Sequence, residues 1–148
     1  MPHDPATMEA AKAALTGHSC AVARGDRLYV SDERGIRPLM EWLAHGEKPL
    51  EDACAADKVV GKAAALLFVY GGVREIYAAV ISEAAAAALD RHGVPYTYAR
   101  MVPRIINRDG TGLCPMESRV MDTDSPEEAF RRLSEALQSM NRNKKTIL

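Results

Sequence analysis

The stretch IYAAVISEAAAAALDRHG, residues 76–93, decides the fold. Its first six residues form an unbroken apolar run, which is typical of a strand that is covered on both faces. Ser82 is a favourable N-cap for the alanine-rich helix that follows, and Gly93 is a favourable end for it. A doubly covered strand that leads directly into a helix predicts an α/β fold with helices on both sides of a sheet.

The segments on either side of this stretch extend the same pattern. Toward the N-terminus the sequence predicts a helix over residues 6–15, two short strands over 20–23 and 28–30, and helices over 36–44 and 57–70. Toward the C-terminus it predicts a strand over 96–106 and a helix over 125–140, ahead of a frayed basic tail. This order predicts an α/β three-layer sandwich with a mixed β-sheet between helices. The chain, 1–148, then forms a single domain, in which the N-terminal helix within 1–17 and the tail 141–148 are peripheral.

The composition excludes several classes of protein. The 148 residues include 19 Lys or Arg and 20 Asp or Glu, so a net charge of −1 offers no basic field for nucleic acid. No apolar run approaches the roughly 20 residues of a membrane-spanning helix, and the first residues lack the apolar core of a secretory signal. Three scattered cysteines without a disulfide framework favour a reduced, cytoplasmic protein.

The segment ADKVVGKAAALL, residues 56–67, contains the first candidate site. Asp57 is placed to cap a helix that carries Lys58 and Lys62 on one face, four residues apart, with Gly61 between them. Two cations at the positive end of a mostly buried helix would be balanced by an anionic small molecule, through its phosphate or carboxylate. In the alternative, the lysines reach solvent and Asp57 alone offsets the charge of the helix end.

A second candidate position follows the buried strand at Ser82 and Glu83. Ligands of open α/β sheets bind in the crevice beyond the carboxyl ends of the strands, where helix N-termini point their N–H groups. Ser82 would fix the start of the helix there. Glu83 would face the two lysines across the crevice, as a charge partner or as a catalytic base.

The third candidate is the free thiol of Cys114, which follows a glycine-containing loop. Pro115 favours a helical first turn, so Cys114 would hold an N-cap-like position in which its thiolate is stabilised. It is then a candidate catalytic nucleophile or redox thiol, with Asn107, Arg108 and Glu117 at the rim of the ligand site. In the alternative, Cys114 is a small buried hydrophobic residue.

Signals for a metal or a cofactor are missing from the sequence. The four histidines are scattered, no P-C-x-x-C sequence completes a zinc site of the deaminase kind, and no phosphate-binding glycine motif of the P-loop kind is present. The sequence therefore predicts no bound metal and no cofactor.

Three segments together resemble a known family: ADKVVGKAAALL (56–67), YAAVISEAA (77–85) and NRDGTGLCPME (107–117). They are similar to a small group of bacterial proteins catalogued as the domain of unknown function numbered eighteen-ninety-three, over residues 20–117. The resemblance implies the cytidine deaminase-like superfamily fold. It also implies that Asp57-Lys58 and Ser82-Glu83 stand where true deaminases carry their zinc ligands, so that the crevice is kept and zinc-hydroxide chemistry is lost.

Two functional hypotheses follow. In the first, a metal-free crevice at two helix N-termini binds an anionic, phosphorylated or nucleotide-like small molecule. The protein is then either an enzyme, with thiol chemistry at Cys114 as one option, or a ligand sensor. In the second, the domain is a catalytically inactive deaminase-fold module that acts through protein–protein contacts. Association into a homo-oligomer is compatible with both, by analogy with deaminase-like domains.

Overall fold

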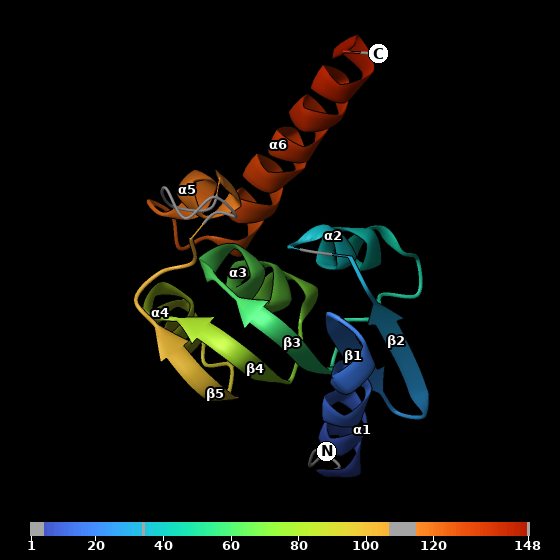
Figure 1. Ribbon diagram of the computed structural model, residues 1–148. Coiled ribbons are helices and arrows are strands. Elements are labelled where there is room, and N and C mark those ends of the chain that lie inside the picture. Colours follow the sequence, from blue (N-terminus) through green and yellow to red (C-terminus); the bar gives the residue numbers. More distant parts are fainter. Residues whose placement is uncertain (1–4, 34, 107–114, 148) are drawn as a thin grey trace.

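A five-stranded sheet forms the centre of the protein, which is described by a computed structural model over residues 5–33, 35–106 and 115–147 (Figure 1). The strand order is β2-β1-β3-β4-β5. The strands are β1 (Cys20–Arg24), β2 (Arg27–Ser31), β3 (Cys54–Val60), β4 (Glu75–Ser82) and β5 (Tyr96–Val102). β1 is antiparallel to both β2 and β3, whereas β3, β4 and β5 run parallel to one another. The sheet is therefore mixed, as the sequence predicts.

Helices cover both faces of this sheet. α1 (Pro5–Ala14), continued by the short turn η1 (Leu15–Gly17), packs on one face against β1 and β3. α3 (Lys62–Gly71) and α4 (Glu83–Arg91) pack side by side on the other face. The remaining helices, α2 (Arg37–Ala44), α5 (Pro115–Val120) and α6 (Pro126–Ile147), surround α3, and Figure 1 shows α6 extending away from the sheet. This arrangement confirms the predicted α/β sandwich.

The local signals around β4 are confirmed in detail. The apolar run lies in β4, between its parallel neighbours β3 and β5, and Ile76 and Ile81 are completely buried in a hydrophobic core. The hydroxyl oxygen of Ser82 accepts a hydrogen bond from the backbone N–H of Ala85 at 3.1 Å, so Ser82 is the N-cap of α4. This cap fixes the point at which the strand turns into the helix.

The predicted start of the next helix is wrong. Residues 57–60 belong to β3, because Val59 and Val60 are β-branched and pair with Val80 and Ile81 of β4. Gly61 is the extended N-cap residue of α3, and the helix begins at Lys62. Asp57 therefore does not cap a helix, and Lys58 and Lys62 do not share a helix face.

The sheet separates two hydrophobic cores of different size. The larger core lies between the sheet and α3 and α4, and its bulkiest fully buried members include Leu66, Leu67 and Phe68. The smaller core lies under α1 and contains Met8, Ala11, Leu15, Ala23, Cys54 and Ala56. Met8 and Ala11 of α1 and Leu15 of η1 are buried in this smaller core, which attaches the N-terminal helix to the sheet.

The C-terminal end of the chain differs from the prediction. α6 continues to Ile147, so the basic segment that was predicted to fray is helical.

Within residues 5–147, apart from the gaps stated above, no helix combines the length and the apolar character needed to cross a membrane.

Candidate functional site

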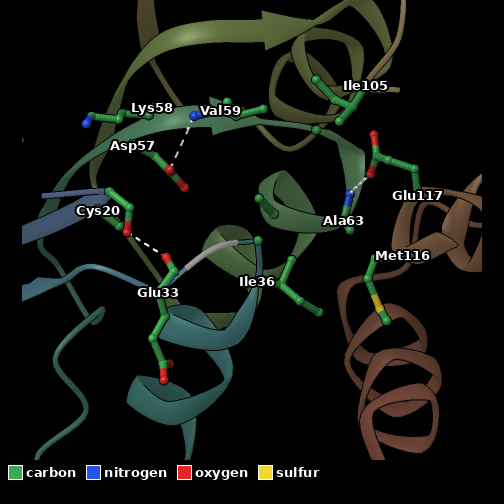
Figure 2. A pocket seen from close by; sticks show the side chains of 14 residues that line it. Cys20, Glu33, Ile36, Asp57, Lys58, Val59, Ala63, Ile105, Met116 and Glu117 are labelled. Carbon is green, nitrogen blue, oxygen red and sulfur yellow. Dashed lines mark hydrogen bonds between the residues drawn. The ribbon is translucent and has the colours of Figure 1, made fainter. Parts of the chain in front are cut away.

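A cavity of about 260 Å³ opens at the carboxyl end of β3, where β1, α2, α3 and α5 meet (Figure 2). Most of its wall is apolar and includes Ile36, Val59, Ala63, Ile105 and Met116. The polar lining residues are Ser19, Cys20, Glu33, Asp57, Lys58 and Glu117. The cavity lies at the carboxyl end of a parallel strand, where open α/β sheets commonly bind ligands.

Asp57 is the charged group at the centre of the cavity. It lies in β3 directly opposite Cys20 of β1, and only 7% of the residue is exposed. Its Oδ1 accepts a hydrogen bond from the backbone N–H of Val59 at 3.4 Å, and Figure 2 shows its carboxylate pointing into the open space. Burial raises the pKa of Asp57 to about 7, against the smaller opposing effect of the backbone N–H groups of Val59 and Lys58 and of the Cys20 thiol. The side chain therefore exchanges a proton near neutral pH.

Cys20 is the chemical partner of this carboxylate. Burial, followed by the negative charge of Asp57 and the hydrogen bond to it, raises the pKa of the Cys20 thiol well above its ordinary value. The thiol consequently stays protonated at neutral pH and donates to Asp57. Cys20 is not an activated nucleophile, since the thiolate is the reactive form.

Glu117 lies on α5, and its carboxylate is placed at the N-terminus of α3. Its Oε1 accepts a hydrogen bond from the backbone N–H of Lys62 at 2.7 Å, and its Oε2 accepts one from Ala63 at 2.6 Å. Gly61 leaves room for this contact, because a β-carbon there would lie 2.6 Å from Cδ of Glu117. The anion at this helix end is therefore a side chain of the protein, whereas the sequence predicts an anionic small molecule there.

The two lysines have separate roles. Lys62 is buried at the start of α3, where its Nζ donates to the carbonyl oxygen of Met121 at 3.0 Å and lies 3.4 Å from Asp124. It therefore fastens α3 to the connection between α5 and α6, outside the cavity wall. Lys58 is exposed on β3, and Figure 2 shows its side chain extending away from Asp57.

The other predicted site residues are not gathered at this cavity. Ser82 and Glu83 begin α4 but do not line the cavity; Ser82 is a buried cap and Glu83 is exposed. Cys114, Asn107 and Arg108 lie outside the described residues. Of the predicted set, the structure brings together Asp57, Lys58, Gly61 and Glu117.

Sequence reasoning missed the pairing of Cys20, a buried residue of β1, with Asp57. The available signal is an aspartate between the alanines and valines of a buried segment, since a buried carboxylate requires a hydrogen-bonding neighbour. Among the residues with described positions, no group of three or more His, Cys, Asp or Glu side chains could hold a metal ion.

Comparisons with known proteins agree with this architecture. Residues 10–137 match the model of the family described as "Domain of unknown function (DUF1893)". The crystal structure of a DUF1893 family protein from Thermotoga maritima is similar, with 27% sequence identity and a TM-score of 0.81, over 91% of this chain and 92% of that chain. No curated protein matches the chain.

Proposed function

The chain belongs to the DUF1893 family, and from its cavity we propose that it binds a small, largely apolar molecule at the carboxyl end of β3. Pockets for small molecules are concave and mostly apolar, with a few polar groups that fix orientation. The cavity has this character, and its volume of about 260 Å³ suits a molecule with one or two rings.

The observation that carries this proposal is the buried carboxylate of Asp57 facing an apolar space. A carboxylate that is withdrawn from water without strong partners costs folding free energy. Such a cost is typical of functional positions, where a bound molecule uses the group. Because Asp57 titrates near neutral pH, it could also exchange a proton with the bound molecule. The proposal requires binding only.

Several finer sequence-based predictions stay predictions. They are membership of the cytidine deaminase-like superfamily, thiol chemistry at Cys114, a rim formed by Asn107 and Arg108, an anionic ligand, a cytoplasmic location and a homo-oligomer. For the anionic ligand, the position at the α3 N-terminus is already filled by Glu117.

The proposal is tested by filling the cavity. Ala64 lines the cavity in the first turn of α3, so Ala64→Met would place a flexible side chain in the open space. Val59→Phe would fill it from β3 and serves as a second variant. Ala87→Met is the matched control, because Ala87 is exposed on α4.

Binding is measured with a set of one-ring fragments, by the changes that they cause in the amide NMR signals of the cavity residues. We expect fragments to shift the signals of Asp57, Val59 and Ala63 in the wild type and in Ala87→Met, and to lose this effect in both filled variants. If no fragment shifts these signals in the wild type, or if the filled variants respond equally, the cavity is not a binding site.

A further inference from the structure

Acidic side chains outnumber basic ones around the cavity. Of the described lining residues, Glu33, Asp57 and Glu117 are acidic and Lys58 is basic. Figure 2 shows that Lys58 and the side chain of Glu33 extend away from Asp57, while Glu117 is turned toward Ala63. The carboxylate of Asp57 is therefore the charge that a molecule inside the cavity would meet.

Asp57 also has unused capacity to accept hydrogen bonds. A carboxylate has about four acceptor sites, yet Asp57 accepts a long bond of 3.4 Å from the backbone N–H of Val59, besides the weak thiol donor of Cys20. The backbone N–H of Lys58 also stabilises the carboxylate, but it donates to the carbonyl oxygen of Ser19 at 3.1 Å. The usual N–H···O distance is about 2.7–3.2 Å. No lysine or arginine within the described part of the chain forms an ion pair with Asp57.

We propose that the ligand of this cavity carries a positively charged nitrogen group, an amine or an amidine, that binds the Asp57 carboxylate while its apolar body fills the cavity. This inference rests on the proposed function and adds the class of ligand. A cation would supply the partner that the buried carboxylate lacks, with charge-assisted hydrogen bonds to its free lone pairs. An anion would meet a desolvated negative charge instead.

The raised pKa of Asp57 gives this ligand class a pH dependence. A nearby cation favours the charged form of a carboxyl group, so the ligand binds the ionised form, whose fraction falls as the pH drops through about 7. The titratable or charged groups around Asp57 are Cys20 on β1, Glu33 before α2, Lys58 on β3 and Glu117 on α5. The pKa of Cys20 lies well above the relevant range, and the other three point elsewhere.

The test uses three probes that share a phenyl ring and differ in charge. Benzamidine is a cation, benzamide is neutral and benzoate is an anion. Their dissociation constants are measured by calorimetry at about pH 8 and about pH 6. At the higher pH we expect benzamidine to bind at least about tenfold more tightly than benzamide, and benzoate to bind most weakly. Because Asp57 is mostly protonated at the lower pH, the affinity for benzamidine should fall roughly tenfold there, while that for benzamide should change little.

Asp57→Asn keeps the size of the side chain and removes its charge. It should bind benzamide as the wild type does, lose the preference for benzamidine and lose the pH dependence. The matched control is Asp26→Asn, because Asp26 is exposed in the turn between β1 and β2, away from the cavity. This control should behave as the wild type.

The outcomes separate the two proposals. If benzamide or benzoate shifts the cavity signals and binds as tightly as benzamidine, the cationic ligand is overturned while the binding site stands. If Asp57→Asn keeps the full preference for benzamidine, the assignment to Asp57 is overturned. If neither these probes nor the wider fragment set shifts the cavity signals, both proposals fail.

Discussion

Two buried carboxylates line the same cavity and differ in what the protein gives them. Glu117 accepts two short hydrogen bonds from the first backbone N–H groups of α3, at 2.7 and 2.6 Å. Asp57 accepts a long bond of 3.4 Å from Val59 and a weak one from the thiol of Cys20, and the backbone N–H of Lys58 that also stabilises it is shared with the carbonyl oxygen of Ser19. Both residues are less than a tenth exposed. Burial alone therefore does not show how well a carboxylate is stabilised by the protein, whereas the number and length of its hydrogen bonds do.

Among substitutions at these two carboxylates, Glu117→Ala should cause the largest loss of stability. The substitution leaves the buried N–H groups of Lys62 and Ala63 without an acceptor and removes the contact that holds α5 against α3. Since hydrogen bonds to a charged group contribute about 1.5–3 kcal/mol each, we expect the free energy of unfolding to fall by roughly 3 kcal/mol. Urea denaturation measures this change. Glu9→Ala, at an exposed position of α1, is the control, and a loss below about 1 kcal/mol for Glu117→Ala would contradict a structural role.

The next effect is the pH dependence of stability at Asp57. Its pKa is raised from 3.8 to about 7 in the folded protein, so between these values the folded state holds a proton that the unfolded state releases. The stabilisation is fully present below the unfolded pKa and is lost as the pH rises through about 7. Relative to Asp57→Asn, the wild type should lose about 2 kcal/mol of unfolding free energy between about pH 5 and about pH 7, and little more above that. Parallel stability curves for the two proteins would show that Asp57 does not titrate in this range.

Gly61→Ala should have the smallest of the three effects and should act through Glu117. The backbone of Gly61 is extended and open to alanine, but the new β-carbon would lie 2.6 Å from Cδ of Glu117. We expect a cost of roughly 1–2 kcal/mol, because the carboxylate must shift within a packed site. A double-mutant cycle with Glu117→Ala tests the cause, since the cost of Gly61→Ala should drop by at least half when the carboxylate is absent. Additive effects would place the strain elsewhere.

Much of the fold could be predicted because the signals that define its strands, caps and turns each depend on only a few neighbouring residues. The apolar run of β4, the Ser82 cap and the turn between β1 and β2 all fall at their expected places. The helix boundary at Asp57 could not be predicted as easily, because an aspartate before an alanine-rich segment is typical of an N-cap. The strand pairing of Val59 and Val60 with β4 outweighs that signal.

The site itself was predicted in part. The sequence predicts an anionic ligand at the start of the helix that carries Lys62, and it includes Glu117 among the rim residues. It does not predict that Glu117 is that anion, because the residues that form the contact are 54 and 55 positions apart. The same limitation applies to Cys20 and Asp57, which become neighbours only when β1 pairs with β3.

The different sizes of the two hydrophobic cores have a consequence for local unfolding of the helices that cover the sheet. α3 is anchored to its side of the sheet by large side chains such as Leu66 and Phe68, whereas α1 rests on a small cluster whose members are mostly alanine and cysteine. Since buried apolar area sets much of the free energy of a sub-global opening, α1 can detach at a lower cost than complete unfolding. We therefore expect the amides of α1 to exchange with solvent earlier than those of α3, which packs on the other face of the sheet beside the cavity.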